Sequence, residues 1–162
     1  MAKKKNKIVV EPFDDIKIVG ICTHLEDYKL AWHINKLLNI NLVKYSDIIN
    51  EDGLEFSFYL YDGGENCNTF NLVEIKNEEG RWVNFSPATD YIIVIRNFIN
   101  DENLNDLLNK IKHIEGVQFA YLVDLDMNSK IDALLEDIEM HEIEIVTDLK
   151  KKSGVLELLQ ES

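Results

Sequence analysis

Residues 16–35 read IKIVGICTHLEDYKLAWHIN, and this stretch sets how the fold begins. Its first seven residues are mostly apolar, which is typical of a short buried strand. Thr23 then predicts a helix start, and Glu26 three residues later completes a capping box. We therefore expect a strand followed by a helix that runs to about Asn39.

The helix expected after Thr23 is apolar over about two-thirds of its surface when each residue turns by about 100°. This pattern predicts that most of the helix is buried. Asp27 and Asn35 fall inside the apolar arc, and buried polar side chains need hydrogen-bond partners. They either brace nearby backbone or anchor a pocket that Tyr28 and Trp32 would wall. The sequence leaves both interpretations open.

Strands joined by turns are expected in the middle of the chain. Apolar and polar residues alternate over 54–61, and residues 69–76 follow as the return strand. A third strand is expected over 81–85. Residues 91–96 are almost continuously apolar, so this strand should lie centrally with both faces covered.

Apolar residues at helical spacing predict two further helices, separated by a strand over 117–123. The stripes consist of Leu104, Leu107, Leu108 and Ile111, and of Ile131, Leu134, Leu135 and Ile138. This order of elements predicts an α+β fold with an antiparallel-dominated sheet and helices packed mainly on one face. It distantly resembles a ferredoxin-like order with extra strands, a likeness that carries no function.

We expect one domain flanked by two short segments. Residues 1–13 form a basic N-terminal segment that is expected to be flexible, and residues 14–140 form the α+β domain. Residues 141–162 are expected to be an acidic C-terminal extension with a short terminal helix, because residues 150–154 interrupt the helical pattern.

The charge of the chain argues against several kinds of partner. The net charge is −13, and without the four lysines of residues 1–7 the remaining 13 basic and 30 acidic groups give −17. Such a body repels phosphate backbones and anionic lipid surfaces, so we expect no nucleic-acid and no membrane binding. Two cysteines are too few for a disulfide framework, which favours a cytoplasmic protein with reduced thiols. Homo-oligomerisation is left open.

Some of these residues resemble the small bacterial IPExxxVDY family, over roughly residues 14–135. The residues that carry the resemblance are His24, Leu25, Asp27, Tyr28, Leu30, Trp32, Asn35, the strand Phe56–Tyr59, and Ala120 with Tyr121. The family signature falls on 83–91, where Asp90 and Tyr91 match and Phe85 replaces the Glu. The family has no assigned activity, so the resemblance implies a bacterial cytoplasmic α+β protein.

No complete catalytic or metal-ligating set is found in the sequence, so we expect no cofactor and no metal, and the sequence leans against an enzyme. Residues 124–135 begin like a calcium loop, but Ser129 replaces the glycine at position six and Leu135 replaces the glutamate at position twelve. A turn in which Asn128 or Ser129 caps the next helix is expected instead. The four histidines have no metal-type spacing.

The sequence favours a non-enzymatic protein-interaction or adaptor module. The alternative is a small-molecule-binding regulatory domain with a pocket at the first helix. The candidate binding residues are the same in both cases: Asp27, Tyr28, Trp32, Asn35, Asp90 and Tyr91. Because a largely apolar helix must lie over central strands, we expect Tyr91 or its strand neighbours to meet Tyr28 or Trp32 in one aromatic cluster.

Overall fold

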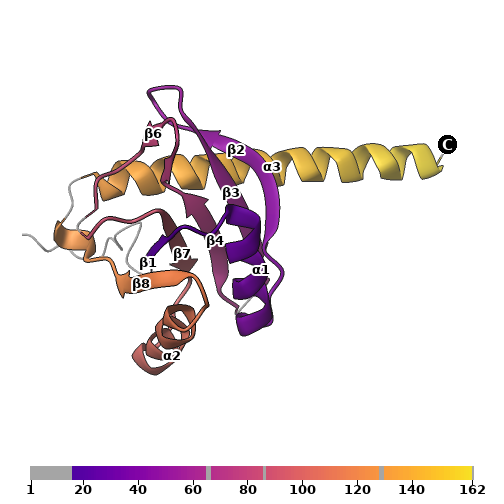
Figure 1. The fold of residues 1–162 in the computed structure, drawn as a ribbon. Coiled ribbons are helices and arrows are strands. Elements are labelled where there is room, and N and C mark those ends of the chain that lie inside the picture. The colour runs from indigo at the N-terminus through magenta and orange to yellow at the C-terminus, as the bar shows by residue number, and fades with distance from the viewer. Residues whose placement is uncertain (1–15, 65–66, 86, 128–129, 162) are drawn as a thin grey trace, which may run out of the picture.

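The structure of the protein is a computed structural model that describes residues 16–64, 67–85, 87–127 and 130–161. A six-stranded sheet with helices on both faces forms the body of the molecule (Figure 1). The strand order is β2-β3-β4-β7-β1-β8, and every neighbouring pair is antiparallel. The strands are β1 (Lys17–Thr23), β2 (Val43–Ile49), β3 (Glu55–Asp62), β4 (Thr69–Glu74), β7 (Tyr91–Arg96) and β8 (Val117–Leu122).

The described residues also form three α-helices, one turn of 3-10 helix and a separate two-stranded pair. Their bounds are α1 (Asp27–Leu38), α2 (Asp101–Lys112), α3 (Ile131–Glu161), the 3-10 turn Leu125–Met127, β5 (Lys76–Asn77) and β6 (Gly80–Arg81). Helices α1 and α2 pack on one face of the sheet, and α3 packs on the other.

The α+β class and the antiparallel sheet are confirmed. Reading β8-β1-β7 and then β2 at the far edge gives a ferredoxin-like order, with β3 and β4 inserted as the extra strands. The expectation that helices occupy mainly one face holds for α1 and α2. Helix α3 covers the opposite face, because its apolar stripe needs a sheet surface that α1 and α2 leave free.

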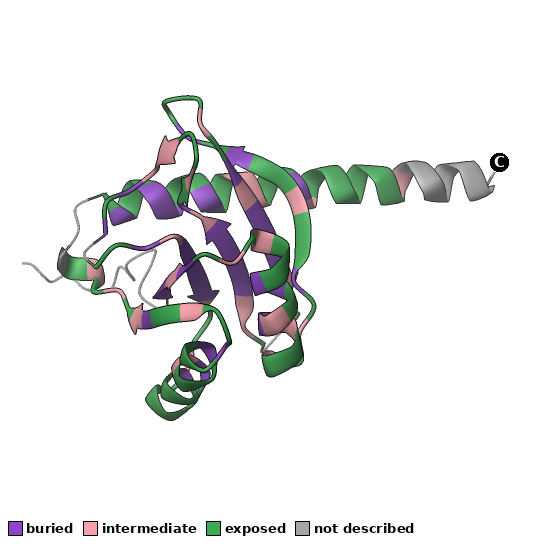
Figure 2. Cartoon of the chain, viewed as in Figure 1, coloured by how far each residue is buried: buried purple, intermediate pink, exposed green. Residues whose placement is uncertain are grey.

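Alternation along the strands builds two hydrophobic layers (Figure 2). Phe56, Phe58 and Leu60 face α3, whereas Tyr59 faces α1 and α2. Strand β7 contributes to both layers and is buried from Tyr91 to Ile95, which confirms its central place. Each face of the sheet is therefore a packed core.

One expected strand is wrong, and one strand in the structure has no counterpart among those expected. The strand expected at 81–85 is not formed, and only Arg81 belongs to a strand, at the end of the short pair β5–β6. Val83 and Phe85 are still buried against the α3 face. Strand β2 was not expected from the sequence, because its pairing with β3 shifts register between Tyr45 and Ile48 and this breaks the alternation.

The short terminal helix expected within residues 141–162 is not found as a helix of its own. Helix α3 continues without interruption from Ile131 to Glu161, so residues 141–161 are not an extension with its own short helix. Ile145 is buried in the core, and His141 contacts Phe58. The second half of α3 projects beyond the sheet (Figure 1). The expected basic segment at 1–13 and the expected cap at Asn128 or Ser129 lie outside the described residues.

Helix α1 begins later than its sequence suggests. Thr23 belongs to β1, and Glu26 occupies the N-cap position without a side-chain bond to the helix, so the capping box is wrong. Burial is also less than expected, because only Leu30, Ala31 and Ile34 are buried. One narrow stripe of α1 faces the sheet, and the rest of the helix is accessible.

Candidate functional site

Asp90 and Tyr91 hold the loop that connects β1 to α1. The backbone N–H of Thr23 donates to Oδ2 of Asp90 over 2.9 Å. The hydroxyl of Tyr91 donates to the carbonyl oxygen of Leu25, also over 2.9 Å. Asp90 and Tyr91 therefore fix the approach to α1, and these bonds give both side chains a structural role.

A third contact holds the same loop from β8. Thr23 Oγ1 donates to the carbonyl of Gly116 over 2.6 Å and accepts from the N–H of Leu25 over 3.1 Å. Gly116 has a φ of +99°, and a Cβ there would lie 2.9 Å from a methyl of Leu25. Only glycine suits both the backbone angle and this close approach.

Asp27 attaches the first turn of α1 to the sheet. Its Oδ2 accepts hydrogen bonds from the hydroxyl of Tyr59 and from Nζ of Lys44, each over 2.9 Å. Burial opposes ionisation of this carboxyl, but the hydrogen bonds from Lys44 and Tyr59 outweigh it, so the pKa of Asp27 is lowered. The same hydrogen bond to Asp27 raises the pKa of Lys44.

Glu74 lies on the same face of the sheet, in the cross-strand row that contains Tyr91. Its Oε1 accepts from the N–H of Ser57 over 3.2 Å. Burial raises the pKa of Glu74, whereas the pKa of Asp27 is lowered. Carboxyls with opposite shifts are typical of acid–base pairs, but here each one is hydrogen-bonded to neighbouring strands. The arrangement joins α1 to the sheet.

Asn35 closes the turn that follows α1. Its Oδ1 accepts from the N–H of Leu42 over 2.7 Å, and its Nδ2 donates to the carbonyl of Leu42 over 3.3 Å. Asn39 ends the helix in the left-handed conformation, with a φ of 54°. Asp27 and Asn35 are therefore satisfied internally, and neither lines the groove described below.

Tyr28 and Trp32 point away from the sheet, with 55% and 57% of their surface exposed. Tyr91 is buried on the sheet face that α1 covers, but the ring contacts of the described residues do not join it to either side chain. The expected aromatic cluster is therefore wrong. The physical reason is that α1 buries only a narrow stripe, and Tyr28 and Trp32 lie outside it.

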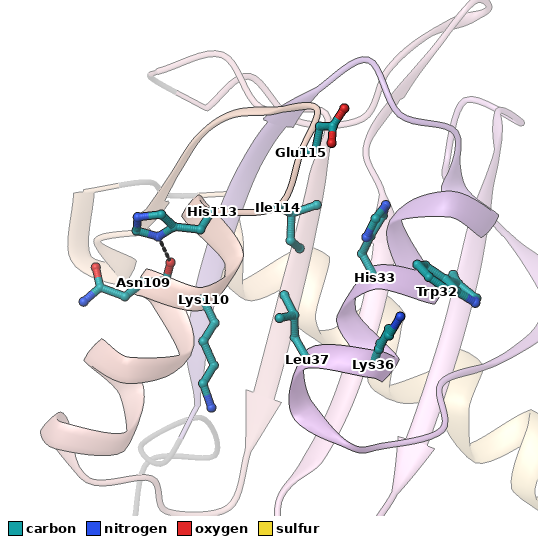
Figure 3. A pocket seen from close by; sticks show the side chains of 9 residues that line it. All are labelled: Trp32, His33, Lys36, Leu37, Asn109, Lys110, His113, Ile114 and Glu115. Carbon is teal, nitrogen blue, oxygen red and sulfur yellow. Dashed lines mark hydrogen bonds between the residues drawn. The ribbon is translucent and has the colours of Figure 1, made fainter.

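An open groove lies between α1 and the C-terminal end of α2, with a volume of about 540 Å³ (Figure 3). Leu37 and Ile114 lie between the two helices and form its apolar middle. Trp32, His33 and Lys36 line the α1 side, and Asn109, Lys110, His113 and Glu115 line the α2 side.

The groove carries more basic than acidic side chains although the protein as a whole is acidic. Lys36 and Lys110 line it together with two histidines, and Glu115 is the one acidic residue among the lining side chains described. Nζ of Lys110 also lies 3.2 Å from Oδ2 of Asp106, one turn earlier on α2. Nζ of Lys36 lies 4.8 Å from the ring centre of Trp32, and the Trp32 ring meets His33 edge-on at 5.0 Å. The arrangement combines an exposed aromatic surface with cations, which suits an anionic group attached to an apolar body.

The groove could not be found from the sequence alone. His33 and Lys36 sit on the polar side of α1, and Lys110 and His113 end α2 where basic residues favour the helix dipole. Each residue has an ordinary local explanation. The two sets meet only because α1 and α2 pack side by side on one sheet face.

Burial and the nearby Asp90 carboxylate raise the pKa of the Cys22 thiol, which keeps it protonated. No group of three or more histidine, cysteine or acidic side chains could hold a metal ion within the described ranges. The Asp124 side chain accepts from the N–H of Asp126 over 3.0 Å, so it forms a local turn.

No family model matches the chain, and no curated protein matches it. Among the helices in the described part of the molecule, none combines the length and apolar composition that crossing a bilayer requires.

Proposed function

We propose that this protein is a non-enzymatic interaction module whose α1–α2 groove binds an acidic segment of a partner protein. The observation that carries the proposal is the presence of two lysines, Lys36 and Lys110, in the lining of the groove beside His33 and His113, in a chain of net charge −13. A partner segment with carboxylates complements this lining. An exposed tryptophan beside the cations adds the kind of aromatic surface on which interfaces concentrate binding energy.

The groove is open to solvent, which favours a protein segment over a small ligand as its occupant. Tyr28 and Trp32 are more than half exposed on the same helix. A segment that fills the groove between Leu37 and Ile114 could also cover Trp32 and so remove an exposed apolar surface from water. Four of the six residues first considered for binding are then structural, namely Asp27, Asn35, Asp90 and Tyr91.

A second candidate is a small anionic metabolite in the same groove. The volume of the groove, about 540 Å³, lies in the range of small-molecule sites. A thermal-shift screen of anionic metabolites separates the two functions. A compound that raises the unfolding midpoint of the wild type but not of Lys110→Glu would favour the regulatory domain.

We also propose that the protein is related to the IPExxxVDY family and that it is cytoplasmic. The residues of α1 and the pair Asp90 and Tyr91 support the family relation. Two cysteines that form no disulfide with each other support the cytoplasmic location.

Site-specific photocrosslinking in cells tests the leading proposal. A photoreactive residue at Leu37 in the groove is compared with one at Phe98, which is 75% exposed and does not line the groove. We expect the Leu37 probe alone to capture a protein through an acidic segment, identified by mass spectrometry of the crosslinked peptide. Capture at both positions alike, or through a neutral or basic segment, contradicts the proposal.

A further inference from the structure

The two edges of the sheet are protected very differently. β2 forms one edge and carries Lys44 and Asp47, and its pairing with β3 is irregular between Tyr45 and Ile48. In addition, Nε2 of His141 lies 2.8 Å from the carbonyl oxygen of Ser46. Charges, irregular pairing and covered backbone groups are the usual ways in which proteins prevent an edge strand from pairing.

β8 forms the other edge and has few of these protections. Residues 117–123 read VQFAYLV and carry no charge. Phe119 and Leu122 are 37% and 41% exposed. The register shift in the β1–β8 pair lies at Thr23 and Val117, so the stretch from Phe119 to Leu122 pairs regularly.

The outer side of β8 offers free backbone groups. The N–H of Val123 donates to the carbonyl of Ile18, which fixes which residues of β8 bond to β1. Because this pattern alternates in an antiparallel ladder, Ala120 and Leu122 turn their N–H and C=O groups away from β1. The described part of the chain places no strand beside them.

We propose that β8 pairs antiparallel with β8 of a second copy, which joins the two sheets across a two-fold axis at Ala120. The sequence of the strand is self-complementary about that residue. Ala120 meets Ala120 of the second copy, and Phe119 meets Tyr121 of the second copy on both sides of the axis.

The pseudo-symmetry of β8 about Ala120 is the reason for choosing a second copy as the occupant. Each chain carries −13, so two copies repel one another over most of their surfaces. Residues 117–123 carry no charge, so two copies can meet there without like charges facing each other. An isologous contact through one strand also closes after two copies, which avoids open-ended assembly. The groove between α1 and α2 is not part of this interface, so the inference is independent of the proposed function.

Sedimentation equilibrium of the full chain over a wide concentration range tests the dimer. We expect the wild type to approach twice the chain mass of 18.8 kDa as concentration rises. Phe119→Lys puts a charge on the edge and should remain monomeric at the same concentrations. Phe98→Lys makes the same chemical change at an exposed position away from β8 and should behave as the wild type does.

Hydrogen exchange locates the dimer surface and shows whether a variant is still folded. In the wild type, the amides of Ala120 and Leu122 should become protected as concentration rises, while those of Phe119 and Tyr121 stay protected throughout. In Phe119→Lys the amides of Ala120 and Leu122 should exchange quickly, whereas those of position 119 and Tyr121 should exchange slowly. A wild type that is monomeric at every concentration, a dimer that Phe119→Lys does not weaken, or a dimer in which Ala120 and Leu122 exchange freely would each overturn the inference.

Discussion

At the scale of single residues, the polar side chains of the first helix and of the Asp90–Tyr91 pair act on the protein's own backbone. Asp90 and Tyr91 fix the loop before α1, Asp27 fixes its first turn, and Asn35 fixes the turn after it. A helix that buries only three residues depends on such attachments for its position. Their loss should therefore be seen first as lost stability.

Tyr91→Phe should lower the free energy of unfolding by about 1–2 kcal/mol, because the carbonyl of Leu25 loses its donor in a partly buried setting. Tyr28→Phe is the matched control, since it removes the same hydroxyl from a ring that is 55% exposed. It should change stability by no more than about 0.5 kcal/mol. Urea unfolding measures both. Equal losses would show that the Tyr91 hydroxyl has no special role.

Asp27 and Glu74 should affect the pH dependence of stability in opposite directions. The pKa of Asp27 is lowered in the fold, so its ionised form stabilises the protein above the ordinary value of about 4. This contribution disappears as the pH falls below that value. Asp27→Asn should therefore cost about 1 kcal/mol at neutral pH, and the cost should shrink in acid.

The raised pKa of Glu74 has the reverse sign, because ionisation there costs stability at neutral pH. Glu74→Gln keeps an acceptor for the N–H of Ser57 and removes the charge. It should be more stable than the wild type at pH 7, and the gain should fade as the pH falls toward about 4. Urea titrations across this range measure both variants, and parallel pH profiles for the two would contradict the assignment.

At the scale of elements, the sequence predicts best where one periodicity runs through the whole element. The alternation of β3, the apolar run of β7 and the stripe of α2 are all found in the structure. β2 is not predicted because its irregular pairing with β3 breaks the alternation of apolar residues. The burial of α1 is predicted wrongly because an apolar arc in the sequence does not show how much of that arc the sheet covers. Tertiary packing decides both cases.

Helix α3 gives a sharp test of where the folded body ends. Ile143 and Ile145 are two residues apart, but Ile143 is 51% exposed and Ile145 only 7%. Ile145→Ala should lower the free energy of unfolding by about 2–4 kcal/mol, and Ile143→Ala by no more than about 0.5 kcal/mol. Chemical denaturation measures both. If Ile145→Ala had no effect, the body would end near residue 140, as first expected from the sequence.

At the scale of the whole molecule, the net negative charge repels polyanions, whereas the lysines of the α1–α2 groove are where we propose that an acidic segment binds. The net charge of −13 is predictable from composition, whereas the basic groove depends on how α1 and α2 meet. None of its lining residues has a distinctive sequence pattern. Of the six candidates from the sequence, Trp32 lines the groove, although it is exposed and not part of a buried cluster as expected.

Duplex DNA or RNA should not bind appreciably at physiological salt. A polyanion must approach a strongly acidic body, and the two groove lysines and four N-terminal lysines release few counterions. Gel-shift titrations at several salt concentrations check this expectation. A shift that survives deletion of residues 1–7 and is lost in Lys36→Glu would instead assign the groove to nucleic acid.

The central claim is that the α1–α2 groove recognises an acidic partner segment, and one matched pair of variants tests it most directly. Lys110 lines the groove and pairs with Asp106 on the same helix, and Lys112, two residues later on α2, does not line the groove. The yield of the crosslink formed at Leu37 is measured in Lys110→Glu and Lys112→Glu, after both are shown to unfold at the same urea concentration. We predict that Lys110→Glu loses the crosslink and that Lys112→Glu retains it. Equal yields in the two variants would contradict the claim.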